Sequence, residues 1–571
     1  MAAMNVNAES FHVFLKDGRV VEYTTDIVDS VVFNKEEASI VTPVVPETPS
    51  EPATPSNPTN PGSIVTKGDI QMLTMGGWLE TGFATWSPVS GAASYKVSVK
   101  AKSAADSEYK AIDNQLIRSY GTYLRADALG LKAGDYTMKV EALDSKGSSV
   151  AKASVVSMTV SAHDRSGFAF ANSETPGAYR ADGTLKDNAV VLYVTEKTKD
   201  NVSCEITTSS NGTKTSASGI QNILTLYKKG YDSRPLCIRL IGNVTDPAVT
   251  DKGDVLLDLG ATKQTSKGVT IEGVGEDAVA NGWGVRIKNA KFVEVRNIGT
   301  MNCDSGEGDN IGLQQACEYV WVHNCDFFYG DAGSDADQVK GDGALDCKKS
   351  TYITFSYNHF FDNGKCNLLG LSEGTTENLY ITYHHNWYDH SDSRHPRCRY
   401  YSAHVYNNYY DGNAKYGIGS TLGSSVFAEN NFFRSCKFPI LTSMQGSDLY
   451  ATANKRDSNN ATFSSEAGGS IKAYGNKFEG VVSYIAYGST TCVVEGKETS
   501  INDRGIDSKA DFDFWLAGSR DAKMPSSVAS YSGGNTYNNF DTNSAVMYSY
   551  TPDSAEQAVE NVKALAGRQN G

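Results

Sequence analysis

The stretch SAHVYNNYY, residues 402–410, joins a short run of β-forming residues to an asparagine, Asn408, and to an aromatic residue two positions later, Tyr410. The same order recurs along the chain, with asparagines at Asn324, Asn358, Asn386, Asn408, Asn431 and Asn476. Neighbouring asparagines are 34, 28, 22, 23 and 45 residues apart, so the smallest unit has 22 residues and the longer ones carry insertions. A repeat of this size predicts an all-β fold, the stacked coils of a right-handed parallel β-helix.

Stacking assigns physical roles to the repeated residues. Coils repeat at the strand spacing of ~4.8 Å, so like residues lie on like. An asparagine at a sharp bend tolerates left-handed backbone angles, and its amide can bond the asparagines above and below. We expect the aromatic residues to fill the interior beside this ladder: Phe360, Tyr388, Tyr410, Phe433 and Phe478.

Histidines and cysteines also fall in the repeats. We expect packing or ladder roles for His359, His384, His385 and His404. The ten cysteines are compatible with disulfides, because the coil spacing permits that geometry, and equally with small buried apolar side chains. We favour the second interpretation.

Composition excludes several classes of function. The chain of 571 residues is too long for one ordinary domain. Its net charge of −14 argues against binding to nucleic acid, which requires a basic face. It lacks an apolar run long enough for a transmembrane helix. The first five residues have neither a basic nor an apolar segment, so the protein is either cytoplasmic or lacks its export signal in this chain. The organisation described next favours the second alternative, and we expect a secreted or surface-held monomer.

The chain is predicted to contain four segments. Prolines occur at every third position from 43 to 61, a spacing that places them along one edge of an extended polyproline helix. We therefore predict a small β module at 1–40 and a Pro-rich linker at 41–66. Residues 67–162 alternate apolar and polar residues, as at Tyr95, Val97 and Val99, and resemble a fibronectin type III sandwich. The β-helix is predicted at 163–571.

Five motifs in the β-helix segment resemble those of the pectate lyases, polysaccharide lyase family 1, and occur in family order. Residues 320–325 (VWVHNC) are similar to that family's Val-Trp-Ile-Asp-His-Cys signature, and residues 342–346 (DGALD) match its Asp-Gly-x-x-Asp calcium motif. Residues 358–360 (NHF), 365–370 (KCNLLG) and 394–399 (RHPRCR) match three more.

The resemblance implies a reaction and roles for particular residues. It implies β-elimination on 4-linked polygalacturonate, with calcium held by Asp342 and Asp346. Arg394 is implied as the proton acceptor, while Lys365 and Arg399 hold substrate carboxylates. Three arginines within six residues form the local basic cluster that a polyanionic substrate requires in so acidic a chain. A guanidinium normally keeps its proton in proteins, so an arginine base implies an alkaline optimum.

One departure from the family pattern affects the predicted metal site. His323 stands where the family has an aspartate, and the resemblance implies that this aspartate is a calcium ligand. His323 itself is a weak candidate ligand, and Asp326, Asp335 or Asp337 could replace the missing carboxylate. Two alternatives therefore stay open: a calcium-independent pectin lyase acting on methylated pectin, and a catalytically silent β-helix that binds acidic glycans.

Overall fold

The computed structural model describes residues 10–14, 20–24, 69–328, 342–371, 373–450, 456–457, 461, 463–528 and 545–569. The chain forms two compact units, residues 1–55 and 56–571. In the first unit, β1 (Ser10–Phe14) and β2 (Val20–Thr24) form an antiparallel pair. The predicted Pro-rich linker lies outside the described residues.

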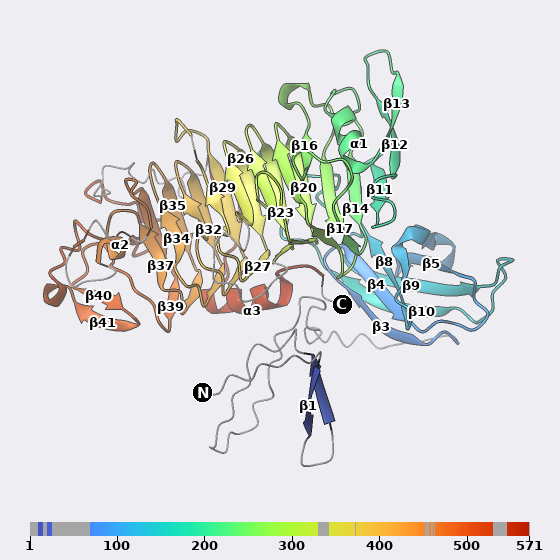
Figure 1. Ribbon diagram of the computed structural model, residues 1–571, viewed down its shortest axis with the longest axis horizontal. Coiled ribbons are helices and arrows are strands. Elements are labelled where there is room, and N and C mark those ends of the chain that lie inside the picture. The colour runs from blue at the N-terminus through green and yellow to red at the C-terminus, as the bar shows by residue number, and fades with distance from the viewer. Residues whose placement is uncertain are drawn as a thin grey trace. The chain divides into compact units, whose positions relative to one another are not determined.

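The second unit begins with two antiparallel four-stranded sheets, visible in blue and cyan in Figure 1. Alternation places Met138, Val140 and Ala142 inward, where they pack with Trp86. A kinship of this sandwich with fibronectin type III stays a prediction. One sheet of the sandwich contains β3 (Met72–Gly77), β4 (Thr81–Trp86), β8 (Leu124–Leu129) and β7 (Ile117–Ser119). Its other sheet contains β10 (Ser154–Val160), β9 (Gly134–Leu143), β5 (Ser94–Ala101) and β6 (Lys110–Ala111).

Three parallel sheets follow, and successive strands of the chain pass from one sheet to the next, as a parallel β-helix requires. The predicted fold class is confirmed. What we call the first sheet has eleven strands: β11 (Val190–Val194), β14 (Leu236–Leu240), β17 (Val269–Gly273), β20 (Lys291–Arg296), β23 (Glu318–His323), β26 (Thr351–Ser356), β29 (Tyr380–His384), β32 (Ser402–Tyr406), β35 (Ser425–Glu429), β38 (Ser470–Tyr474) and β42 (Trp515–Leu516).

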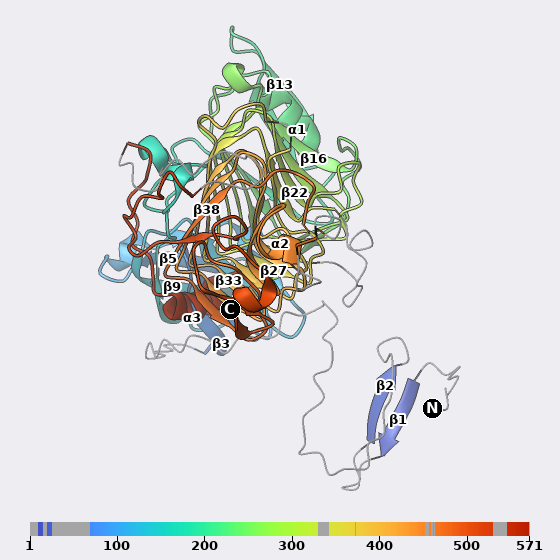
Figure 2. The ribbon, with the colours of Figure 1, turned by 90° about the vertical axis from the view of Figure 1, so that its left-hand side faces the viewer.

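The second and third sheets complete each coil, and Figure 2 views the stack from the end formed by the C-terminal coils. The second sheet contains β15 (Asn243–Val244), β18 (Val279–Asn281), β21 (Gly299–Met301), β24 (Asp326–Phe327), β27 (His359–Phe361), β30 (Trp387–Asp389), β33 (Tyr409–Asp411), β36 (Phe432–Arg434) and β39 (Lys477–Glu479). The third contains β16 (Asp254–Asp258), β19 (Gly284–Lys288), β22 (Ile311–Gln314), β25 (Leu345–Lys348), β28 (Leu368–Leu369), β31 (Arg397–Cys398), β34 (Tyr416–Ser420) and β37 (Phe438–Thr442).

Short elements decorate the coils. Two hairpins project from them, β12 (Ser203–Thr207) with β13 (Lys214–Ser218), and β40 (Thr491–Val494) with β41 (Lys497–Ser500). The described helices are α1 (Ile220–Tyr227), α2 (Ser447–Tyr450) and α3 (Ala555–Leu565). Short 3-10 turns occur at Asp106–Glu108, Asn114–Leu116, Phe168–Ser173, Ala261–Lys263 and Asn502–Arg504. None of these described helices is both long and apolar enough to cross a membrane.

The asparagine ladder exists, but it begins one coil later than predicted. The side-chain amide of Asn386 donates to Oδ1 of Asn408 at 2.9 Å, and that of Asn408 donates to Oδ1 of Asn431 at 3.0 Å. Asn358 and Asn476 continue the same chain of bonds. The assignment of Asn324 to the ladder is wrong, because Cys325 occupies that position and its N–H donates to Oδ1 of Asn358.

The bend itself is made by the residue before each ladder position. Tyr357, His385, Asn407 and Asn430 have φ values of 51°, 53°, 52° and 49°, and Asn324 has 49°. The expectation that the ladder asparagines adopt the left-handed conformation is therefore wrong, since the strain lies one residue earlier. The asparagines at the bend instead bind the C-terminal segment. The amides of Asn407 and Asn430 both donate to the Asp553 carbonyl, and that of Asn324 to the Leu565 carbonyl.

The predicted aromatic stack fills the interior. The rings of Phe360, Tyr388, Tyr410, Phe433 and Phe478 follow one another at centroid distances of 4.3–5.3 Å, and Phe327 extends the stack at 4.7 Å from Phe360. The ten cysteines are free thiols, eight of them buried, so the interpretation as small apolar side chains is confirmed.

Candidate active site

The third sheet brings most of the predicted site residues to one edge of the stack. β22, β25, β28 and β31 are consecutive neighbours in this sheet, and Gly312 of β22 pairs with Asp346 of β25. Lys365 precedes β28 and pairs with Ser393, the residue before Arg394. The loops that enter these four strands therefore lie next to one another.

Three carboxylates gather here, two on these loops and one on β25 itself. Oδ1 of Asp346, buried on β25, accepts a 2.8 Å hydrogen bond from the Leu368 N–H. Asp309, buried in the loop before β22, accepts a 3.0 Å bond from the Gly343 N–H through its own Oδ1. Asp342 is the more exposed member and pairs with Lys365, whose Nζ lies 3.3 Å from its Oδ1. Asp342 and Asp346 were predicted, whereas Asp309 was missed.

Asp309 can be recognised as a site residue only once the register of the coils is known. It belongs to the loop before β22, one coil ahead of the loop that carries Asp342. No motif marks it. A search for acids on the loops entering adjacent strands of the third sheet would have found it.

The electrostatics of this acidic cluster suit a divalent cation. Burial raises the pKa of Asp309 to about 9, and the charges of Asp346 and Asp342 add to the effect. Burial also raises the pKa of Asp346 to about 6. Crowded, desolvated carboxylates lower their free energy when a cation replaces the protons. Hard oxygen donors of this kind are the ligands that calcium prefers, so these residues fit calcium.

The predicted proton acceptor, Arg394, lies beside the acidic cluster. Arg394 is half-buried before β31, with φ of 65°, and its carbonyl accepts a 2.7 Å hydrogen bond from the Asn367 N–H. Its positive charge acts on Asp346. Within the described part of the chain, its guanidinium makes no hydrogen bond or ion pair, so it is available to a ligand.

Arg399 is committed to a neighbouring acid. Its guanidinium forms an ion pair with Glu466 through Nη2 and a 3.1 Å bond through Nε, and its Nη1 donates to the Leu371 carbonyl at 2.7 Å. Arg397 reaches the same carboxylate at 3.5 Å. Sequence reasoning did not find Glu466, since nothing in its own stretch marks it.

Comparison with known proteins supplies the identity. A family model described as pectate lyase matches residues 149–571. The chain belongs to the pectate lyase family. It is therefore a polysaccharide lyase, as predicted. A pectate trisaccharide-lyase of Bacillus licheniformis is 33% identical over 240 residues, which cover 42% of this chain and 67% of that relative. Pectate lyase B of Dickeya chrysanthemi is 32% identical over 195 residues, which cover 33% of this chain and 51% of that relative.

Solved structures of pectate lyases resemble the chain more distantly. A pectate lyase from Bacillus sp. N165 in complex with trigalacturonate has a TM-score of 0.45 at 22% identity, covering 71% of this chain and 99% of that one. Pectate lyase II from Xanthomonas campestris has a TM-score of 0.43 at 20% identity, with the same coverage.

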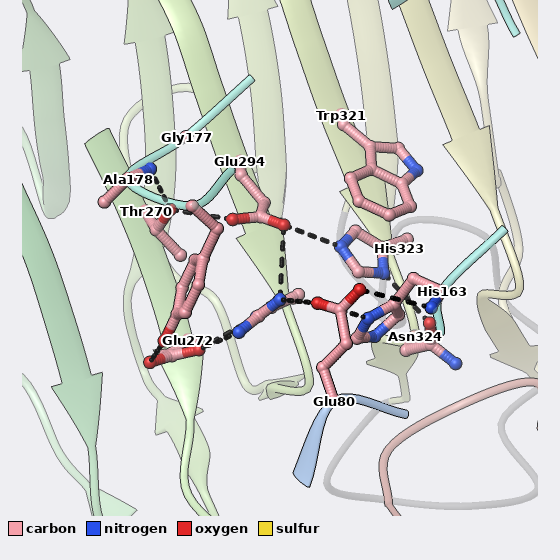
Figure 3. Close-up of polar contacts among 12 residues, drawn as sticks. Glu80, His163, Gly177, Ala178, Thr270, Glu272, Glu294, Trp321, His323 and Asn324 are labelled. Atoms are coloured by element: carbon pink, nitrogen blue, oxygen red, sulfur yellow. Dashed lines mark hydrogen bonds and ion pairs between the residues drawn. The ribbon is translucent and has the colours of Figure 1, made fainter. Parts of the chain in front are cut away.

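The prediction that His323 contributes to the metal site is wrong. His323 ends β23 in the first sheet, whereas Asp346 lies in the third. Its side chain is fully buried, with Nε2 3.2 Å from Oε1 of Glu294 and Nδ1 2.9 Å from Oδ1 of Asn324 (Figure 3). Burial lowers the pKa of His323 to about 3. The histidine at position 323 therefore removes no carboxylate from the acidic cluster of this pectate lyase.

The surroundings of His323 form the contact between the sandwich and the β-helix. Glu80 of the β3–β4 turn is fully buried and pairs with His163 at 3.1 Å (Figure 3). It also pairs with Arg165 and, at 3.5 Å, with Arg296. Although burial opposes its charge, its contacts with His163, Arg165 and Arg296 hold the pKa of Glu80 well below its usual range. The ring of His323 packs edge-to-face against that of His163, with ring centroids 4.7 Å apart, so His323 belongs to this contact.

Of the other proposed replacements for a missing carboxylate, only Asp326 belongs to the described residues, and it does not extend the acidic cluster. Asp326 lies in the second sheet, where Oδ2 accepts a 2.7 Å hydrogen bond from Nε of Arg568. Asp335 and Asp337 fall outside the described residues, so a role for Asp337 stays a prediction.

Proposed function

We propose that the chain cleaves 4-linked polygalacturonate by calcium-assisted β-elimination, with Asp309, Asp342 and Asp346 holding the cation and Arg394 taking the proton. The observation that carries this proposal is the meeting of three carboxylates with Lys365 and Arg394 on one edge of the third sheet. Because the chain belongs to the pectate lyase family, this edge is the natural place for the reaction.

The residues divide the work. Arg394 acts as a neutral guanidine, the form that an alkaline medium supplies, and accepts the proton from C5 of a uronate. The C–H electron pair then forms a C4–C5 double bond, and the C4–O4 bond breaks. The leaving oxygen takes a proton from water. Lys365 and Arg399 hold substrate carboxylates by charge-assisted hydrogen bonds. Calcium, when bound, supplies positive charge that stabilises the carboxylate next to the carbon that loses its proton.

The argument for a calcium-independent pectin lyase was the carboxylate missing at position 323. His323 lies in a different sheet from the acidic cluster, and Asp309 supplies a third carboxylate there. That argument therefore falls away. A silent glycan-binding β-helix requires positive charge but no buried acidic cluster, and the cluster favours the enzyme.

We extend the proposal to the setting of the enzyme. Polygalacturonate is an extracellular polymer, so we propose a secreted or surface-held monomer that acts on this substrate.

The test measures ultraviolet absorbance of unsaturated product from polygalacturonate and from methylated pectin, each with calcium and with a chelator. We expect product from polygalacturonate that a chelator abolishes. Asp309→Asn should require at least tenfold more calcium for half-maximal rate, whereas Asp304→Asn, an exposed acid on the same loop, should behave as wild type. Chelator-resistant cleavage of methylated pectin would establish a calcium-independent pectin lyase. Binding of polygalacturonate without product would establish a catalytically silent β-helix that binds acidic glycans.

A further inference from the structure

A second group of potential metal ligands lies away from the proposed active site. Asp164, His384 and His385 each offer one ligand atom, and these atoms lie within 4.8 Å of one another. His384 ends β29 in the first sheet, His385 is the bend residue that follows, and Asp164 lies in the segment between β10 and the β-helix. The proposed lyase chemistry uses none of them.

The distances suit a small divalent cation. Nδ1 of His384 lies 3.0 Å from Nδ1 of His385 and 3.9 Å from Oδ2 of Asp164. Zinc binds histidine nitrogen and carboxylate oxygen at about 2.0–2.2 Å, so two ligands of a tetrahedral ion lie roughly 3.3 Å apart. The two nitrogens are already close to this separation, and only a small movement of the Asp164 carboxylate would complete a three-residue site.

The imidazole rings are held in place by their neighbours. Nε2 of His385 is 3.0 Å from Oδ2 of Asp553, the carboxylate–histidine arrangement that commonly orients a metal ligand. The ring of His385 stacks on Tyr357 at 4.7 Å, and the ring of His384 stacks on Tyr406 at 5.0 Å. With Asp553 accepting from Nε2, the Nδ1 lone pair of His385 points into the group.

We propose that Asp164, His384 and His385 bind Zn²⁺ or a first-row divalent cation of the same class. Two imidazoles with one carboxylate favour such ions over calcium, which prefers oxygen ligands. The side chain of Asp164 is 34% exposed, which gives the ion an entry path and leaves room for a water ligand. The ion would tie the segment that follows the sandwich to the β29 coil and, through Asp553, to the C-terminal segment.

The structure offers a variant that removes a ligand and keeps the bend. His385→Asn introduces the residue found at the same bend in the next two coils, where the side-chain amides of Asn407 and Asn430 donate to the Asp553 carbonyl. Asp164→Asn removes the carboxylate charge. His390→Asn is the matched control, since His390 is an exposed histidine on the same coil.

The experiment uses the full chain, stripped of metal with a chelator and titrated with Zn²⁺ by calorimetry in the presence of calcium. The absorption spectrum of Co²⁺ and the thermal midpoint are second readouts. We expect one Zn²⁺ per wild-type chain, at least tenfold weaker binding in His385→Asn and Asp164→Asn, and wild-type binding in His390→Asn. Zinc should raise the thermal midpoint of the wild type and of His390→Asn only.

Three outcomes would overturn the proposal. Wild type without stoichiometric Zn²⁺ binding would show that the group is a simple histidine–histidine hydrogen bond. His385→Asn binding as tightly as wild type would place the zinc elsewhere. Loss of binding in His390→Asn would point to the surface histidine instead.

Discussion

The backbone N–H of Gly343 donates a 3.0 Å hydrogen bond to Oδ1 of Asp309. This bond joins two consecutive coils and holds an unpredicted carboxylate against the Asp-Gly-x-x-Asp motif. A Cβ added at Gly343 would lie 2.4 Å from Oδ1 of Asp346, so the glycine also makes room for that carboxylate.

Gly343→Ala should therefore disturb the acidic cluster. The new methyl group must displace Asp346, so we expect at least tenfold weaker calcium binding by calorimetry and a matching rise in the calcium required for activity. Gly374→Ala is the control, because a Cβ there would meet nothing within 4 Å. Unchanged calcium binding in Gly343→Ala would remove Asp346 from the ligand set.

Arg394→Lys should abolish most turnover while substrate binding is nearly kept. Lysine keeps the positive charge but loses the planar fork and moves the basic atom. We expect kcat on polygalacturonate to fall by orders of magnitude with little change in KM. Arg434→Lys, at an exposed position of the second sheet, is the matched control. A variant that retains more than about a tenth of the wild-type rate, a loss under ~1.4 kcal/mol, would exclude Arg394 as the base.

Glu466→Gln should strengthen substrate binding. Glu466 occupies the guanidinium of Arg399 and lies 3.5 Å from Arg397, so its carboxylate competes with the uronate carboxylates of the substrate. We expect KM for polygalacturonate to fall several-fold with kcat little changed, an effect that added salt weakens. A higher KM would mean that Glu466 positions Arg399 for the substrate.

Asn408→Ala should destabilise the β-helix. Its amide donates to Asn431, and its Oδ1 accepts from Asn386, so truncation leaves buried partners unsatisfied at a cost of ~1–3 kcal/mol. Denaturant unfolding of the full chain measures the change. Exposed Asn502→Ala should leave the midpoint unchanged, and equal midpoints for both variants would argue against a stabilising ladder.

His359 should make stability depend on pH. Although burial opposes its charge, hydrogen bonds with Asp326 and Asp389 raise the pKa of His359 to about 9 from an ordinary 6.5. The charged form is favoured in the folded state, so the stabilisation is complete below about pH 6.5 and is lost as the pH rises toward 9. A difference of this size corresponds to about 3 kcal/mol.

His359→Gln should remove that dependence. Denaturant titrations from pH 6 to pH 9.5 should show the gap between wild type and variant shrinking as the pH rises. A gap that is constant over this range would mean that His359 contributes packing alone.

The fold could be predicted because each coil is built from local preferences. β-forming runs, ladder asparagines and interior aromatics recur every coil, and like residues stack on like. The wrong assignment of Asn324 also follows from reading local residues alone. The sequence shows an asparagine there, but only the hydrogen bond from the Cys325 N–H to Asn358 reveals that Cys325 occupies the ladder position in this coil.

Some residues of the candidate site could be predicted from the sequence, and others were found only in the structure. Short motifs marked Asp342, Asp346, Lys365, Arg394 and Arg399, because those residues lie in contiguous stretches that resemble a known family. Only the tertiary structure joined Asp309 and Glu466 to them, and removed His323. Insertions between coils vary in length, so the loops that meet are decided by the stacking of whole coils and not by distance along the chain. The sequence by itself thus determined the repeat and the family, and stacking decided which charges face one another.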